Sequence, residues 1–141
     1  MAHILIVEDD PIGAEVAVII CVAAGHTIAY APDGLEALAL LARERFDLAL
    51  VGVQMPGLDG LSLTRRVREN PAWGHMPVMG CTAKAGAEDL ALMRQAGMVD
   101  VVTKPYRNGT LRDRIAAVLA DSRTIETVVP QAVSPVMPPA C

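Results

Sequence analysis

Short apolar runs alternate with helix patterns along this chain, and this alternation constrains the fold more than any other feature. The runs lie at residues 4–7, 27–31, 48–53, 77–81 and 101–103. Short, mostly nonpolar runs are typical of strands that are buried on both faces of a sheet. Each run is followed by a segment long enough for a helix. The pattern therefore predicts an α/β fold, a doubly wound parallel sheet of five strands.

Helix signals occupy the connecting segments. Asp10 and Pro11 supply an N-cap and a first-turn proline for a helix that stops at Gly25. Asp33 and Glu36 resemble a capping box. The helix that they begin is expected to bury one row of side chains, which comprises Leu35, Leu38, Leu41 and Ala42. Further helices are expected at 60–68 and 85–96, and a last one carries an apolar stripe from Leu111 to Leu119.

Composition excludes several classes of function. The chain has 141 residues, is 52% hydrophobic and carries a formal charge of -4, with its basic residues scattered. It therefore has enough apolar content for one core, and it lacks the basic face that nucleic acid binding needs. The early acidic residues do not fit a secretory signal, and the apolar run at 16–24 is too short to span a membrane. We expect a cytoplasmic protein with neither nucleic acid nor membrane as a partner.

The three cysteines do not form a recognisable framework. Cys21, Cys81 and Cys141 are odd in number and far apart. This spacing fits neither a zinc site nor a disulfide framework. Cys21 and Cys81 are expected to be small core residues.

Polar residues follow the apolar runs at the points where strands of a parallel sheet would end together. Glu8 and Asp9 follow the first run, Thr82 follows the fourth and Lys104 follows the fifth. Chemistry in such sheets takes place at this edge. Near the end of the third run stands Gly52, at a position where a carboxylate could act as a nucleophile and glycine cannot.

These motifs together resemble the receiver domain of two-component response regulators. The resemblance rests on four stretches, which are Ile-Leu-Ile-Val-Glu-Asp-Asp, Met-Pro-Gly-Leu-Asp-Gly, Cys-Thr-Ala and Thr-Lys-Pro-Tyr. It covers residues 1–121 and implies a CheY-like, flavodoxin-like sheet with strand order 2-1-3-4-5. It is similar to the single-domain or hybrid-kinase-associated type. The implied function is signalling in a phosphorelay and not catalysis.

The resemblance also implies roles for the residues at the strand ends. Glu8, Asp9 and the carbonyl of Gln54 take the positions that bind Mg²⁺, a cation that prefers oxygen ligands. Thr82 and Lys104 take the positions that contact the phosphoryl oxygens. Other interpretations remain open: Glu8 and Asp9 as a solvated strand end, and Thr82 as a helix cap. The peptide bond before Pro105 is expected to be cis, from the family.

Two parts of the implied switch are missing. Gly52 takes the place of the phosphoacceptor aspartate, and Val101 takes the place of the aromatic switch residue. Asp47 lies one strand length too early to replace the acceptor, and Asp59 is expected to cap the following helix. Gly52 is then either a natural loss, which the second departure at Val101 favours, or a substitution in a working regulator. Mg²⁺ binding is expected to be weakened, and Lys104 to pair with the remaining carboxylates.

The first helix is apolar nearly all round. One stripe is expected to face the sheet and comprises Ile12, Val16, Ile19, Ile20 and Ala23. A second stripe includes Ala14, Val18, Cys21 and Val22, and we expect it either to bind a partner or to be covered by neighbouring elements. The resemblance implies a histidine kinase or phosphotransfer protein as that partner. A homodimer through the same helix is the other possibility.

Residues 122–141 differ from the rest of the chain. They contain four of the ten prolines among Val, Ala and Met. Such a segment is expected to be extended, and it is too apolar for an ordinary disordered tail.

The sequence thus predicts a receiver-like signalling protein that acts by protein binding and is not phosphorylated as written. The alternative is a conventional phosphoacceptor regulator in which Gly52 is a substitution. A phosphotransfer enzyme with an aspartate nucleophile at a strand end is disfavoured, because that position is vacant.

Overall fold

A computed structural model describes residues 1–55, 57–83, 86–107 and 109–128 of this chain, with side chains described as far as Asp121. Strands and helices alternate throughout. The strands are β1 (His3–Val7), β2 (Thr27–Ala31), β3 (Leu48–Gly52), β4 (Val78–Thr82) and β5 (Asp100–Thr103). The helices are α1 (Pro11–Ala23), α2 (Gly34–Arg43), α3 (Gly60–Glu69), α4 (Ala87–Ala96) and α5 (Thr110–Val128).

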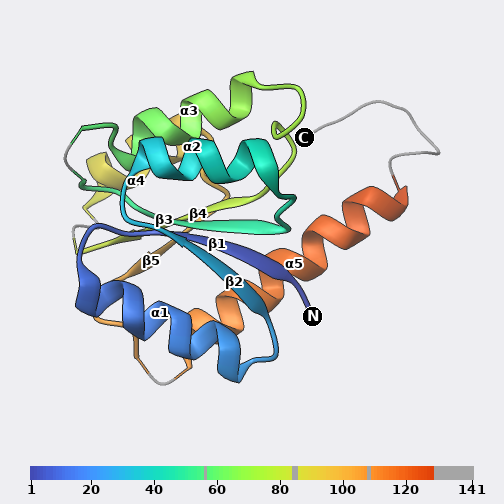
Figure 1. The fold of residues 1–141 in the computed structure, drawn as a ribbon, viewed down its shortest axis with the longest axis horizontal. Helices are drawn as coiled ribbons and strands as arrows, with labels where there is room; N and C mark the ends of the chain where they lie inside the picture. Colours follow the sequence, from blue (N-terminus) through green and yellow to red (C-terminus); the bar gives the residue numbers. More distant parts are fainter. Residues whose placement is uncertain (56, 84–85, 108, 129–141) are drawn as a thin grey trace.

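The strands form one parallel sheet in the order β2-β1-β3-β4-β5. This confirms the predicted fold class and strand order. Helices α1 and α5 cover one face of the sheet, and α2, α3 and α4 cover the other (Figure 1). All carboxyl ends of the strands therefore meet at one edge, which is where the polar residues were expected to gather.

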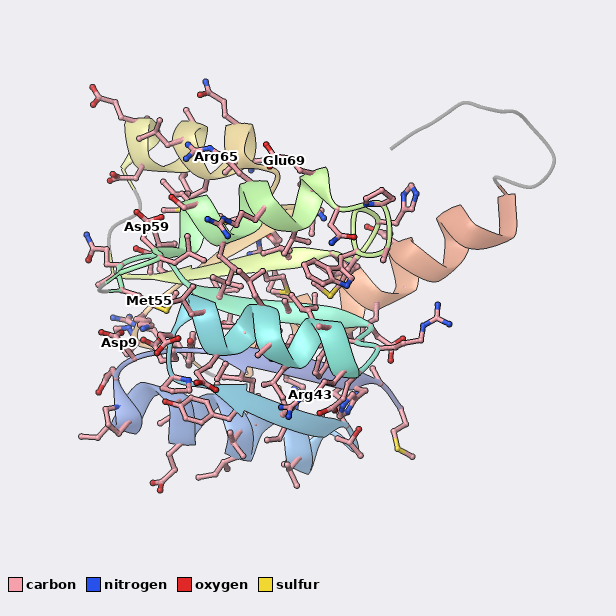
Figure 2. The ribbon with its side chains drawn as sticks, turned by 45° about the horizontal axis from the view of Figure 1, so that its top comes forward. Asp9, Arg43, Met55, Asp59, Arg65 and Glu69 are labelled. Carbon is pink, nitrogen blue, oxygen red and sulfur yellow. The ribbon has the colours of Figure 1, made fainter. Side chains whose placement is uncertain are left out.

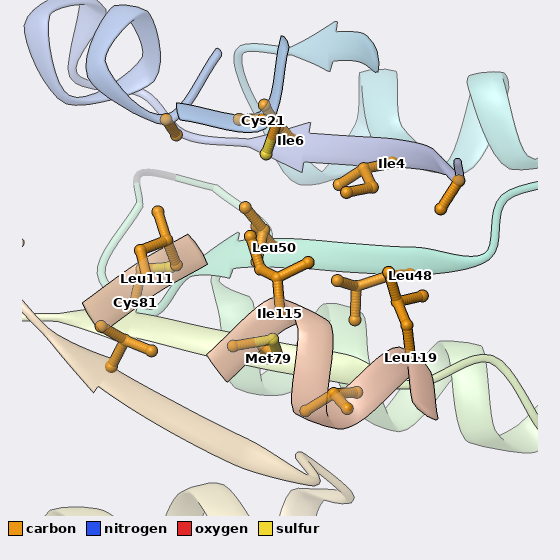
Figure 3. Close-up of a cluster of buried hydrophobic side chains, with 14 residues drawn as sticks. Ile4, Ile6, Cys21, Leu48, Leu50, Met79, Cys81, Leu111, Ile115 and Leu119 are labelled. Atoms are coloured by element: carbon orange, nitrogen blue, oxygen red, sulfur yellow. The ribbon is translucent and has the colours of Figure 1, made fainter. Parts of the chain in front are cut away.

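A hydrophobic core lies on each face of the sheet. Alternation along β1 sends Ile4 and Ile6 toward α1 and α5, and Leu5 and Val7 toward α2, α3 and α4. Figure 3 shows the first of these cores, in which Ile115 of α5 lies against the side chains of the central strands. Strands β3 and β4 are buried along their whole length. This explains why their sequences are apolar without alternation.

The predicted helix signals are present as hydrogen bonds. Asp10, Asp33 and Asp59 each accept backbone N–H bonds at the start of a helix. Gly97 ends α4 in the left-handed conformation, with φ of 110°. Asp59 is thus a helix cap, as expected. The peptide bond between Lys104 and Pro105 is cis, also as expected.

The rotation of α1 differs from the predicted one: Ile20 of the expected inward stripe packs partly against the core, but Ile12, Val16 and Ile19 are exposed. Ala14 and Cys21 of the expected partner stripe are buried against the sheet, and Val18 packs partly against the same core. Only Val22 of that stripe is exposed. Hydrophobicity cannot orient a helix that is apolar all round. Side-chain size can, because small residues at positions 14, 17 and 21 let the helix backbone lie close to the strands.

Helix α2 shows the same preference for small residues. It buries Gly34, Ala37 and Leu41, whereas Leu35 is 66% exposed and Ala42 is exposed as well. A Cβ atom at Gly34 would lie 2.7 Å from the carbonyl oxygen of Leu58. The expected stripe was therefore wrong at positions 35 and 42, because close approach of the backbone decides which face is inward.

Helix α5 extends further than the sequence indicated. It runs to Val128, so residues 122–128 are helical, and the extended conformation expected for them is wrong. The rest of the predicted tail, 129–141, lies outside the described residues. Within the part of the chain that is described, no helix is long and apolar enough to cross a membrane.

Candidate functional site

The carboxyl ends of β1, β3, β4 and β5 bring Glu8, Gly52, Thr82 and Lys104 to one edge of the sheet. Asp9 and Met55 lie at this end of the molecule, and Arg43 lies toward the other (Figure 2). The backbone N–H of Lys104 donates to the carbonyl oxygen of Thr82 at 2.8 Å, which ties the two strand ends together. Thr82 itself is buried.

Glu8 and Lys104 form an ion pair within this site. The Lys104 ammonium donates to Glu8 Oε1. The side chain of Glu8 is 7% exposed and that of Lys104 is 26% exposed, so solvent screens the pair only partly. Glu8 Oε2 also accepts from the backbone N–H of Asp10 at 3.3 Å. Both carboxylate oxygens of Glu8 therefore have partners inside the protein.

The Glu8 carboxylate lies over Gly52. A Cβ atom at Gly52 would be 3.1 Å from Glu8 Oε2 and 3.2 Å from Glu8 Oε1. The hollow beside Gly52, which Cys81 and Tyr106 also line, is too narrow to hold a water molecule. Glu8 thus takes up the space into which a side chain at position 52 would project.

Tyr30 fixes the end of β1 from the neighbouring strand. Its hydroxyl donates to the carbonyl oxygen of Glu8 at 2.7 Å. The pKa of Tyr30 is raised, first by burial and then by the negative charges of Glu8, Asp9 and nearby carboxylates. Sequence analysis did not single out Tyr30. Its register opposite Ile6, two residues before Glu8, was the only available signal.

Tyr106 and Cys81 lie beneath the site. Burial raises the pKa of the Cys81 thiol to about 11 and also raises the pKa of Tyr106, which is hydrogen-bonded to that thiol. Both groups are therefore neutral near pH 7. They shape the floor of the site and contribute no charge to it. Tyr106 directly follows the Lys-Pro motif, which was the signal for it in the sequence.

Of the residues expected to bind Mg²⁺, Glu8 already has a partner within the protein and Asp9 is exposed. Glu8 is held by Lys104, and Asp10 caps α1 by accepting from the N–H groups of Ile12 and Gly13. Asp9 and Gln54 are exposed. Among the described residues, no three Asp, Glu, His or Cys side chains are grouped so as to hold a metal ion. Mg²⁺ is usually held by one or two carboxylates and several waters, so Asp9 could serve as a ligand at once, and Glu8 only after leaving Lys104.

Val101 lies on β5 opposite Gly80 and packs partly against the core on the α2–α4 face. It has no ring and no polar atom that could respond to Thr82. The structure thus brings Glu8, Gly52, Thr82 and Lys104 to one edge of the sheet. Val101 lies two residues before the end of β5. Asp9 and Gln54 are exposed to solvent.

Comparisons with known proteins agree with this fold. The family model for the response regulator receiver domain matches residues 4–116. The chain is 40% identical over 117 residues to the transcriptional regulatory protein CseB of Streptomyces coelicolor, which is 83% of this chain and 49% of CseB. It is 34% identical over 120 residues to protein PilH of Pseudomonas aeruginosa, with 85% of this chain and 99% of PilH covered.

A solved structure gives the same result. The receiver domain of sensor histidine kinase PA1611 from Pseudomonas aeruginosa has a TM-score of 0.74 and 31% identity, over 85% of this chain and 95% of that one. It holds a magnesium ion in its active-site cleft. The chain spans about half the length of CseB, so the activity of that whole protein does not transfer to it. Fold, strand-end residues and family model together show that this chain belongs to the response regulator receiver domain family of two-component systems.

Proposed function

We propose that this receiver works without an aspartyl phosphate and acts by binding a protein partner, either a histidine kinase or a phosphotransfer protein. The observation that carries the proposal is the Glu8–Lys104 ion pair over Gly52. It places a carboxylate beside Lys104, where a phosphorylated aspartate would otherwise present its oxygens.

The two carboxylates nearest to Gly52 along β1 and its loop that already have partners, Glu8 and Asp10, are poorly placed to act as the phosphoacceptor. Glu8 is nearly buried, and its oxygens are engaged by Lys104 and by the N–H of Asp10. A phosphodonor could reach it only after the ion pair opened, which would leave Lys104 partly buried without a counter-charge. Asp10 is held as the cap of α1. The strand-end site therefore supports binding and not covalent chemistry.

Mg²⁺ binding is weakened by the same arrangement. Removing a carboxylate at position 52 removes one ligand, and Glu8 must leave Lys104 before it can serve as another. Loss of a ligand and loss of negative charge both lower the affinity of an oxygen site for a divalent cation. The receiver then occupies a partner surface in a state that depends on neither metal nor phosphate, and it has no enzymatic activity of its own.

One observation favours the alternative of a phosphoacceptor regulator with a substitution at position 52. The atoms nearest to a Cβ at Gly52 are the far end of the flexible Glu8 side chain and not backbone. Thr82 and Lys104 are also retained at their strand ends. Gly52→Asp should therefore fit once Glu8 turns away.

The test is incubation with acetyl phosphate and Mg²⁺, followed by intact mass measurement. We expect no mass increase for this chain and an increase of one phosphoryl group for Gly52→Asp, which serves as the positive control. A stoichiometric increase in the unmodified chain would overturn the proposal. In parallel, affinity for a phosphotransfer protein should be the same with and without the phosphodonor.

A further inference from the structure

Helix α1 presents an apolar stripe to solvent. Ile12 is 76% exposed, and the stripe continues with Val16 at 40%, Ile19 at 60% and Val22 at 54%. Spacings of four, three and three residues place these side chains on one face of a helix. The only charged residue of α1 is Glu15. We call these four residues the outward face of α1.

The outward face is the largest concentration of exposed apolar side chains among the described residues. Nine large hydrophobic residues are exposed among the described residues, and four of them belong to the outward face. Helices α2 and α4 each expose one such residue, Leu35 and Leu92. Tyr30 on the edge strand β2 is 40% exposed. Tyr30 is two residues after Ile28, which packs under α1, so both side chains lie on the same side of the sheet. Contiguous exposed apolar surface of this kind marks a binding surface.

The size of the outward face argues against a second copy as its occupant. A helix of 13 residues is about 20 Å long and about 10 Å wide. The resulting strip of a few hundred Å² is well below the roughly 800 Å² per partner of a stable interface. A segment that is already tethered to the same chain needs less area, because little translational and rotational freedom is lost when it binds.

Residues 129–141 match this surface in chemistry. They contain no charged residue, four prolines and the apolar residues Val129, Ala132, Val133, Val136, Met137 and Ala140. Proline-rich segments bind apolar surfaces that carry an aromatic ring, because little backbone freedom is lost. The aromatic ring here is that of Tyr30.

Residues 129–141 are also long enough, as a segment, to reach along the outward face of α1. Thirteen residues extend to about 40 Å, twice the length of α1. Helix α5, which precedes this segment, packs beside α1 and shares its core (Figure 1). We propose that residues 129–141 bind the outward face of α1 in the same chain. This inference does not depend on whether position 52 can be phosphorylated.

A nitroxide label on Cys141 tests the proposal in the full chain. Cys21 and Cys81 are buried, and burial raises the pKa of each thiol to about 11, so neither reacts readily at neutral pH. In ¹⁵N spectra, the label should weaken amide signals of α1 and Tyr30 and leave those of α2 and α4 unchanged. Absent weakening, or weakening spread evenly over all faces, would overturn the proposal.

Two matched variants show whether the outward face itself is recognised. Ile19→Asp should abolish the weakening at α1, because it places a charge in the centre of the face. Leu35→Asp replaces a similarly exposed residue on α2, and it should leave the weakening of the α1 signals unchanged. If Ile19→Asp has no effect, or Leu35→Asp has the same effect, the segment does not bind this face.

Mixing distinguishes one chain from two. A ¹⁵N-enriched sample without the nitroxide is mixed with a sample of natural isotope abundance that carries the nitroxide on Cys141. Signals of α1 should stay unchanged in this mixture. Weakening of α1 signals in the mixture, in proportion to the fraction of chains that carry the nitroxide, would mean that the segment binds a second copy, and binding within one chain would be refuted.

Discussion

The ion pair between Glu8 and Lys104 is the contact on which the state of the site depends most directly. Glu8→Gln keeps the size of the side chain and leaves the Lys104 ammonium without a counter-charge in a site only 26% exposed. We expect the free energy of unfolding to fall by about 1–3 kcal/mol, measured by urea denaturation. The control is Glu44→Gln, which disturbs an exposed pair with His3 and should change stability by less than about 0.5 kcal/mol. Equal effects of the two changes would contradict the importance of the buried pair.

Restoring a carboxylate at position 52 should change the response to Mg²⁺. In Gly52→Asp, the new side chain displaces Glu8 from above position 52 and adds a third negative charge beside Glu8 and Asp9. The metal-free variant should be less stable than the parent, because like charges are crowded together. Mg²⁺ should then raise the thermal midpoint of the variant markedly and that of the parent little. An equal rise in both would show that Gly52 does not limit metal binding.

Because the thiols of Cys21 and Cys81 are buried, the folded protein should lose stability at alkaline pH. Folding raises the pKa of Cys21 and Cys81 from 9.0 to about 11, chiefly through burial. Above pH 9 the unfolded chain loses these protons while the folded chain keeps them, so stability is full below pH 9 and declines between pH 9 and 11. Each thiol accounts for roughly 2 kcal/mol of this decline. Cys81→Ala should flatten the pH dependence of urea unfolding between pH 8 and 10, and an unchanged slope would contradict the account.

At the scale of single residues, the position of the site could be predicted from the sequence, but the contacts between its side chains could not. Glu8, Thr82 and Lys104 could be located because they follow strands whose carboxyl ends must meet in a parallel sheet. The general pairing of Lys104 with a remaining carboxylate also followed from the missing charge at Gly52. That Glu8 lies directly over Gly52 depends on packing between residues 44 positions apart, which no local pattern encodes.

At the scale of elements, the orientation of α1 makes a direct mutational prediction. Ala17 is buried against the sheet, and the neighbouring Val16 is 40% exposed. Ala17→Leu should therefore lower the free energy of unfolding by about 1–3 kcal/mol, because the core has no room for three more carbons. Val16→Leu should change it by less than about 0.5 kcal/mol. The reverse order in urea denaturation would restore the orientation first expected from the sequence.

Helix boundaries were predictable where a side chain makes the cap. Asp10, Asp33 and Asp59 each bond to backbone N–H groups, and these bonds are specified by residues within one turn. Helix rotation was not predictable, because α1 has apolar residues on every side. The burial of Gly34 and Ala37 in α2 likewise depends on how closely the helix approaches its neighbours. The end of α5 was missed because no cap or glycine marks it before Val128.

At the scale of the whole molecule, the positions that the resemblance assigns to the phosphoacceptor and to the aromatic switch residue lie on different strands of one sheet. Gly52 ends β3, and Val101 lies on β5 with β4 between them. Strand β4 lies between the strands of Gly52 and Val101, and Thr82 is the switch residue at its end. The resemblance to receivers implies a signal that passes along this route from the site to the face formed by α4 and β5. Both ends of the route are altered here.

This arrangement predicts that repair of the switch needs two changes. Gly52→Asp should permit phosphorylation, because Thr82 and Lys104 are already at the site. The resulting change at α4 and β5 should stay small, since Val101 packs partly into the core and has no ring to swing as Thr82 moves. In Gly52→Asp with Val101→Tyr, phosphodonor-dependent chemical shift changes at α4 and β5 should exceed the sum of those in the single variants, as coupled residues show. Val101→Tyr alone should give none, because nothing is phosphorylated. A full response in Gly52→Asp alone would mean that only the acceptor is missing, and the chain would then be a working regulator with one substitution.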